Sequence, residues 1–231
     1  GMNKVASFVF VISLWIPLAV MAGQVMYAPT GLANDLLVID LKTNKVISRI
    51  PELENAHGLA ASANSEYLVA GSMQALDMGG PNKIAKPAAV SEAEHAAHHA
   101  AASQSDMPLG RSFVSIVHPQ HGHVMRKVAV RGITHHTAVS PDGKFAIAVH
   151  SGAGGISVID LKKMTVAREL PTGRTPNFAL FSHNGRYAYV SNAASGTVSE
   201  IYTRDWSVKR ELTVGKEPEH MVLTPDAAWL F

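Results

Sequence analysis

Two short sequence phrases recur along this chain at a fixed interval. The first is a β-rich phrase that begins at Leu36, Val114, Ile156 and Val198. The last two intervals are equal, with a period of 42, and the first interval is one such period plus an insertion of 36. The second phrase opens a tight turn and keeps the same spacing, at Ser62, Ser140, Ser182 and Thr224. Self-similarity at about 40–45 residues predicts an all-β fold, a β-propeller built from four-stranded blades.

One complete period shows the expected strands. Runs rich in β-branched and aromatic residues are separated by turn residues, and they cover residues 136–139, 145–149, 156–161 and 166–170. The residues around Tyr27 align by phase with the second strand of such a unit. Four periods and the insertion account for the whole interval from Tyr27 to Phe231. Propeller rings usually need more blades, so we expect an incomplete ring of about four blades from a longer protein.

The insertion, residues 74–109, lies between the second and third strands of its blade. Ser91 and Glu94 form a capping box before an alanine-rich stretch, which predicts one short helix ending near residue 102. On that helix His95, His98 and His99 would project from one face, at the i, i+3 and i+4 positions. Paired imidazoles at this spacing are ligands suited to Cu or Zn. The alternative is a flexible lid that binds no metal.

The segment 1–22 has the pattern of an export signal. Lys4 precedes an apolar run over residues 5–20, and small residues lead up to a cleavage site after Ala22. A retained membrane anchor is disfavoured, because the run is short for a bilayer and contains Pro17. We therefore expect a signal peptide over 1–22 and a propeller over 23–231 in the periplasm or the secreted fraction, with no membrane contact after cleavage.

Composition narrows the chemistry. The chain has no cysteine, which excludes disulfides, thiolate metal ligands and a c-type haem attachment motif. Its formal charge is +2 with both signs interspersed, so no basic tract predicts a nucleic-acid partner. A small ligand or a metal is the expected partner, and the residues identify no protein partner.

The phrase at residues 189–199, flanked by the Ser-Pro-Asp-Gly-Lys and Val-Ile-Asp-Leu-Lys phrases, resembles the YVTN-repeat β-propellers. This resemblance covers nearly all of residues 24–231 apart from the insertion. It implies the propeller fold, which that family shares with the d1-haem propeller of dissimilatory nitrite reductase. The reductase also carries a c-type haem domain, and its cysteine motif is absent here. Since propellers of this kind include adhesins, surface-layer proteins and haem-binding domains, the resemblance implies no single function.

The position of a residue within the 42-residue repeat, here called its phase, predicts where it lies in a blade. By phase, eight candidate ligand residues lie at the start of the innermost strands, where they would line the mouth of a central channel. They are His57, His135, His136, Arg174, Asn177, Lys216, Glu219 and His220. His150 is expected in a loop on the same face, whereas His118, His121, His123 and His183 fall on the opposite face. Imidazoles from neighbouring blades can meet at one transition metal, and the two cations suit the carboxylates of a tetrapyrrole. Alternatively, these loops simply favour polar residues.

Three functions follow as hypotheses. The first is an exported binding module that holds a transition metal or a haem-like tetrapyrrole at its histidine-bearing face. The second is an enzyme of d1-type haem maturation or a related redox reaction, and the third is a structural or adhesive propeller without cofactor. The sequence contains no Gly-x-Ser-x-Gly motif or other nucleophile constellation, so it favours a non-enzyme and assigns no catalytic residue.

Overall fold

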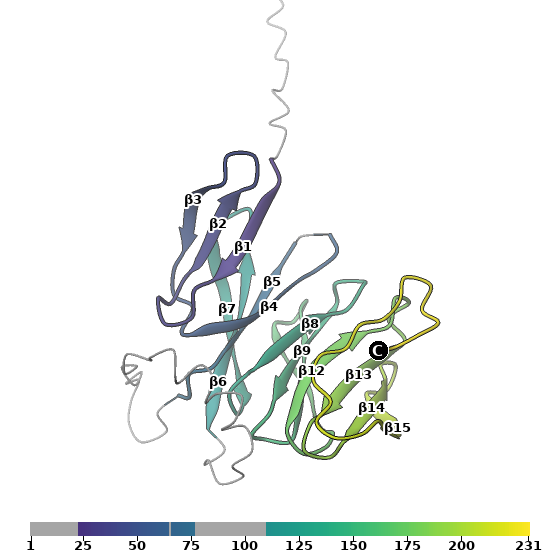
Figure 1. The fold of residues 1–231 in the computed structure, drawn as a ribbon. Coiled ribbons are helices and arrows are strands. Elements are labelled where there is room, and N and C mark those ends of the chain that lie inside the picture. The colour runs from purple at the N-terminus through teal and green to yellow at the C-terminus, as the bar shows by residue number, and fades with distance from the viewer. Residues whose placement is uncertain (1–22, 65, 77–109) are drawn as a thin grey trace, which may run out of the picture.

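The computed structural model describes residues 23–64, 66–76 and 110–231, and over these residues the chain is all β (Figure 1). The first sheet has the order β1 (Val25–Pro29), β2 (Leu36–Asp40), β3 (Lys45–Ile50). The second has the order β4 (Ala56–Ala61), β5 (Leu68–Ser72), β6 (Arg111–His118), β7 (His123–Arg131). The third consists of β8 (His136–Val139), β9 (Phe145–His150), β10 (Gly155–Asp160), β11 (Thr165–Pro171). The fourth consists of β12 (Pro176–Phe181), β13 (Tyr187–Asn192), β14 (Thr197–Tyr202), β15 (Ser207–Thr213).

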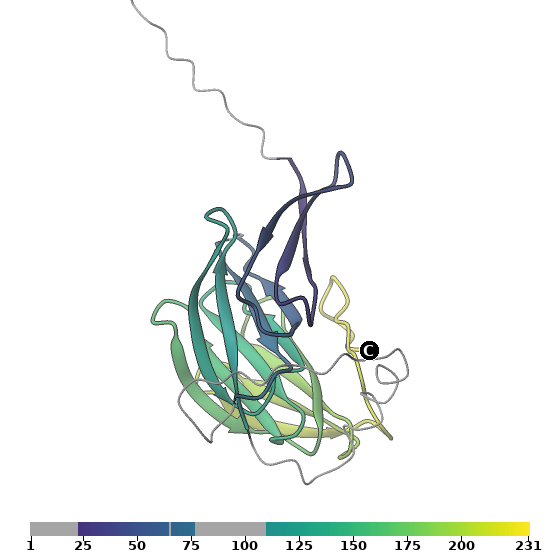
Figure 2. The same cartoon turned by 90° about the vertical axis from the view of Figure 1, so that its left-hand side faces the viewer.

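Each sheet is a meander of antiparallel strands that pair in chain order, as a propeller blade requires. The strands predicted for one period correspond to β8–β11, with ends that differ by one residue at most. In Figure 1 the sheets follow one another from the purple N-terminal sheet to the green C-terminal sheet, without closing a ring. Figure 2, turned by 90°, shows them as adjacent layers, with the yellow C-terminal segment beside them. The expected incomplete propeller is confirmed.

The recurring Ser or Thr phrase has a single structural role. The hydroxyl of Ser140 donates a 2.6 Å hydrogen bond to Asp142, and the backbone N–H of Phe145 donates to that hydroxyl at 3.0 Å. Ser182 makes the same pair of bonds with Asn184 and Tyr187, at 2.7 and 3.0 Å. Such side-chain bonds to the local backbone close the turn between the first two strands of a blade. This explains why the phrase repeats in register with the strands.

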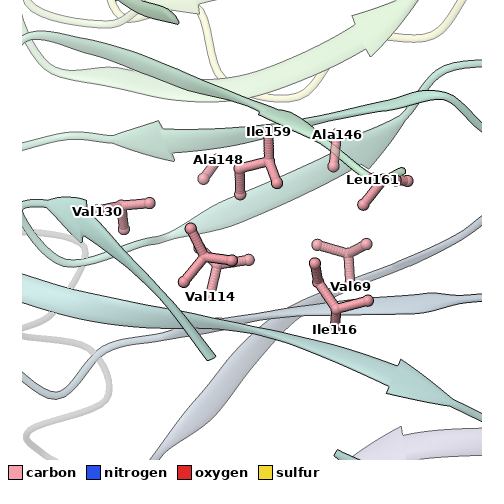
Figure 3. Packing of buried hydrophobic residues seen from close by; sticks show 9 residues of the cluster. Val69, Val114, Ile116, Val130, Ala146, Ala148, Ile159 and Leu161 are labelled. Carbon is pink, nitrogen blue, oxygen red and sulfur yellow. The ribbon is translucent and has the colours of Figure 1, made fainter. Parts of the chain in front are cut away.

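Apolar side chains gather between neighbouring blades rather than around the central axis. The core between the second and third sheets includes Val69 and Ile116 on one side and Ala146 and Ile159 on the other, all completely buried (Figure 3). Similar cores join the first sheet to the second and the third to the fourth. Complete burial of a valine or isoleucine contributes about 1.5–3 kcal/mol. Neighbouring blades are therefore held together by apolar contacts between their faces. The starts of the innermost strands lie outside these cores and can carry polar residues.

The insertion interrupts the second blade between β5 and β6, the position expected from the repeat. Near the start of the insertion, the backbone N–H of Leu76 donates a 2.6 Å hydrogen bond to the carbonyl of Arg111 at the start of β6. The blade is thus continuous across the insertion. The predicted helix and signal peptide lie in residues 77–109 and 1–22, outside the described residues.

Candidate functional site

The innermost strands β4, β8 and β12 lie side by side, because β8 packs against both of the others. Residues at the starts of these strands, together with the corresponding residues after β15, form two rows of positions that are equivalent in successive repeats. The first row consists of His57, His135, Asn177 and Glu219. The second row, one residue later, consists of Gly58, His136, Phe178 and His220. The repeat thus brings together residues from four successive units of the chain.

The first row contains two neighbouring pairs. The rings of His57 and His135 are tilted by 47°, and their centroids are 5.2 Å apart. The amide of Asn177 donates a 2.5 Å hydrogen bond to the carboxylate of Glu219. Asn177 is buried, whereas His57 and Glu219 are exposed, so the row is buried in its middle and open to solvent at both ends. Neighbouring blades therefore touch through their predicted site residues.

Three members of the second row are neighbouring rings, of which the first two are stacked and the last is tilted. His136 and Phe178 have centroids 4.1 Å apart at an interplanar angle of 23°, and Phe178 and His220 are 4.9 Å apart at 41°. Sequence reasoning missed Phe178, although it occupies the same phase as both histidines. Only its position in the repeat, 42 residues after His136 and 42 before His220, could have revealed it. A phenylalanine in a strand otherwise indicates packing in a core. Phe178 joins the two imidazoles that phase had predicted to converge.

Gly58 occupies the second row because the two innermost strands approach closely there. A Cβ at Gly58 would lie 3.0 Å from the Cα of His136 and 3.0 Å from the backbone nitrogen of Thr137. Both atoms belong to backbone and cannot rotate away. The glycine therefore allows β4 and β8 to approach and sets the position of the His136 backbone.

His136 is neutral at pH 7. Burial is the main cause that lowers its pKa from 6.5 to about 4; nearby His135, His220 and His57 also lower it, whereas its hydrogen bond to the Ala179 carbonyl raises it. Nε2 lies 3.2 Å from that carbonyl, which can only accept, so Nε2 carries the proton. The lone pair of the neutral ring is consequently on Nδ1. His136 combines the properties of a neutral donor and of a potential ligand.

Comparison with known proteins assigns the fold to a family. The model of the family described as Lactonase, 7-bladed beta-propeller, matches residues 96–230, which is more than half of the chain. The chain belongs to this lactonase-type propeller family. No curated protein matches it.

Two solved structures are similar to this lactonase-type propeller. The first is Kuenenia stuttgartiensis hydrazine synthase, with a TM-score of 0.68 and 18% identity, covering 89% of this chain and 51% of that one. The second is the Myceliophteria thermophila Cps50 (Swd1) β-propeller domain, with a TM-score of 0.61 and 13% identity, covering 89% and 56%. At these identities the similarity concerns the fold. The chain spans about half the length of either relative.

The two predicted cations of this lactonase-type propeller are exposed, and Arg174 is held by the loop of its own blade. Its guanidinium donates a 3.0 Å hydrogen bond to the carbonyl of Ala194, and its backbone N–H donates to the hydroxyl of Ser195 at 2.8 Å. Lys216 lies on the exposed segment after β15. The role of both cations toward a ligand stays a prediction.

His150 has a structural environment rather than an open one. It is the last residue of β9, is buried, and lies before the loop in which phase placed it. Its Nδ1–H donates to the carbonyl of Ile133 at 3.0 Å, while the hydroxyl of Ser157 donates to Nε2 at 2.7 Å. Burial lowers its pKa. Both ring nitrogens of His150 are thus engaged in hydrogen bonds within the protein.

The predicted metal ligands of the insertion, His95, His98 and His99, lie outside the described residues. Within residues 23–64, 66–76 and 110–231, no group of three or more His, Cys, Asp or Glu side chains is placed to hold a metal ion. The same residues include no helix long and apolar enough to cross a membrane.

Proposed function

We propose that this propeller is an exported binding module that takes a haem-like tetrapyrrole at the start of its innermost strands. The observation that carries the proposal is the row of neighbouring rings His136, Phe178 and His220, contributed by β8, by β12 and by the segment after β15. Within the family, the phrase at residues 189–199 supports a closer relationship to the YVTN-repeat propellers. The apolar run after Lys4 supports export to the periplasm or the medium.

Stacked flat rings favour a planar ligand. Aromatic rings attract one another in offset-stacked or edge-to-face arrangements, and in the second row the rings of His136 and Phe178 already stack with centroids 4.1 Å apart. His220 and His57 are exposed, so a ligand can reach the outer ends of both rows. A planar conjugated ring would extend the existing stack rather than disrupt it.

A tetrapyrrole suits these residues better than a bare ion. A structural or catalytic zinc needs three or four protein ligands, and the described residues offer no such group. A macrocycle supplies its own equatorial donors and needs one or two imidazoles from the protein. His57, His220 and neutral His136 are the residues that would hold it, and exposed Arg174 and Lys216 would meet its carboxylates. When bound, the iron of such a macrocycle would supply redox chemistry.

Titration with haemin tests this proposal. Purified full-length protein should give a Soret band that saturates near one equivalent, and His136→Ala and Phe178→Leu should weaken binding by about tenfold or more. His183→Ala is the matched control, because His183 is exposed and bonded to the carbonyl of Thr224. Absence of saturable binding, or equal loss in the control, would overturn the proposal.

For the insertion we retain the proposal of Cu or Zn binding through His95, His98 and His99. Its support is the spacing of the three histidines in a predicted helix. Replacing all three by alanine in the full chain should remove one equivalent of bound Zn²⁺ in a calorimetric titration. An unchanged stoichiometry would exclude the insertion as a site.

Lactone hydrolysis is the second candidate, because the matched family is described as lactonase. The feature that favours it is the exposed carboxylate of Glu219, positioned by Asn177 and able to act as a general base toward water. A pH-stat assay with glucono-δ-lactone should then show turnover that Glu219→Gln abolishes. Haemin binding without turnover would favour the first proposal, and turnover without haemin binding would favour the second.

A further inference from the structure

The last strand of each of the four sheets carries an irregularity at the same place. Where β2 pairs with β3 and β6 pairs with β7, the register shifts by one residue, so Ile47 and Met125 have no partner on the neighbouring strand. Ala167 in β11 and Lys209 in β15 are the extra residues of the corresponding shifts. These four β-bulge residues hold equivalent positions in the repeat. Each sheet therefore presents one bulge residue on its outer edge strand.

The bulge residues differ between the first two blades and the last two. Ile47 and Met125 are large and apolar, yet they are 57% and 41% exposed. The third blade has the small Ala167 instead, and the fourth has Lys209, whose ammonium lies 3.4 Å from the carboxylate of Asp205. The first strand of this series, β3, is the outer edge at the left of the first sheet in Figure 1. The first two blades thus expose an apolar side chain at equivalent points of their outer edges.

Charge divides the outer strands in the same way. The strands of the last two blades, β11 and β15, contain three basic residues and two glutamates. The strands of the first two blades, β3 and β7, contain no acidic residue and five basic ones: Lys45, Arg49, Arg126, Lys127 and Arg131. The excess of positive charge therefore accompanies the two exposed apolar residues.

Two of these cations have no carboxylate beside them. In the fourth blade, the guanidinium of Arg210 donates hydrogen bonds of 3.0 and 2.9 Å to the carboxylate of Glu200. In the second blade Ile116 stands opposite the equivalent Arg126. Within the part of the chain that the structure describes, neither Arg126 nor Lys45 forms an ion pair, and both are exposed. Their charges are available to an anionic partner.

We propose that the outer strands of the first two blades, β3 and β7, form a surface that binds peripherally to an anionic lipid bilayer. Apolar side chains enter the headgroup region of a bilayer, and neighbouring lysine and arginine side chains attract its anionic headgroups. An added β-strand is a poorer partner, because a bulge interrupts the backbone groups of each edge. The contact needs no membrane-spanning segment. It departs from the expectation, drawn from the N-terminal segment, that the mature protein has no membrane contact.

Co-sedimentation with lipid vesicles tests the proposal. The parent protein is the full chain with Val9→Asp and Leu14→Asp, which interrupt the apolar run of residues 5–20 so that this segment does not itself enter lipid. It should pellet with vesicles of phosphatidylcholine and phosphatidylglycerol, and it should stay in the supernatant with vesicles of phosphatidylcholine alone. Raising the salt concentration should weaken the binding.

Two variants of this parent separate the apolar and the charged contributions. Ile47→Ser combined with Met125→Ser should weaken binding to the anionic vesicles by about tenfold or more, because two apolar side chains no longer leave water. Lys45→Gln combined with Arg126→Gln should weaken it by about tenfold to thirtyfold, since two charges are lost near an anionic surface.

The matched control lies in the third blade. There Ala167→Ser combined with Arg168→Gln changes the equivalent positions and should leave vesicle binding unchanged. All the substituted positions in the blades are exposed, so the thermal midpoints of the variants without lipid should equal that of the parent. Equal binding to neutral and anionic vesicles, no binding to either, or an equal loss in the control would each overturn the proposal. Unchanged binding of the Ile47→Ser, Met125→Ser variant would also overturn it, because the surface would then fit any polyanion.

Discussion

The side-chain amide of Asn177 donates a 2.5 Å hydrogen bond to the carboxylate of Glu219, 42 residues further along the chain. The two residues hold the same position in consecutive repeats, so one period of sequence separates the partners of a single contact. The hydroxyl of Ser191 in β13 adds a second connection by donating to the backbone carbonyl of Glu219 at 2.6 Å. The segment after β15 is thereby fixed to the fourth blade.

Asn177→Ala should lower the free energy of unfolding by about 1–2 kcal/mol, because it removes a partly buried bond to a charged acceptor. Glu219→Gln keeps an acceptor oxygen and should cost less. Urea denaturation followed by circular dichroism measures both variants. Equal stability of Asn177→Ala and the parent would show that the bond contributes nothing.

Gly58→Ala should destabilise the fold by about 1–3 kcal/mol, because its Cβ would press against backbone atoms of β8. Gly152→Ala is the matched control: a Cβ there meets no atom within 4 Å. Thermal unfolding should separate the two variants clearly. The close approach of β4 and β8 would be disproved if both behaved alike.

The pKa of His136, lowered by burial to about 4, makes stability depend on pH. The unfolded chain binds this proton near pH 6.5 and the folded chain near pH 4, so His136 favours the folded state above pH 6.5. That contribution falls as the pH falls from about 6.5 to about 4, and it amounts to about 2 kcal/mol between pH 7.5 and 5. Burial also lowers the pKa of His150, so protonation of this residue likewise reduces stability as the pH falls.

Urea titrations at pH 7.5 and pH 5 measure this effect. His136→Gln should remove most of that share of the pH dependence, since glutamine does not titrate and can still donate to the carbonyl of Ala179. His183→Gln, at an exposed position, should retain the parental dependence. A pH profile of His136→Gln identical to that of the parent would contradict the assignment.

His150→Asn should be tolerated better than His150→Leu. In the next blade Asn192 holds the equivalent position, and its amide donates a 2.9 Å hydrogen bond to Ser199, the counterpart of Ser157. Leucine would leave the Ser157 hydroxyl and the carbonyl of Ile133 buried without a partner, at a cost of about 1–3 kcal/mol. Thermal midpoints should rank parent, His150→Asn and His150→Leu in descending order. The reverse ranking of the two variants would refute the equivalence of the blades.

Much of the fold could be predicted, because the repeating strand and turn phrases indicate the order of the strands in each blade. The spacing of Ser140 and Ser182 located the turns, and the alternation of apolar residues located the strands of a complete blade. Phase also predicted that His136 and His220 would converge. It could not predict that Phe178 lies between them, since a phenylalanine in a strand has the same pattern whether it packs in a core or joins two imidazoles.

The sequence alone determined which positions are equivalent, because a constant period places His57, His135, Asn177 and Glu219 at the same point of successive blades. Only the tertiary structure decided how those positions meet. Burial lowers the pKa of His136 and encloses His150. The ring of His121 stacks against those of His118 and His123. All of these contacts depend on how closely the backbones approach and how the rings are oriented. A periodic pattern fixes neither, because side-chain contacts between blades form only once the sheets pack face to face.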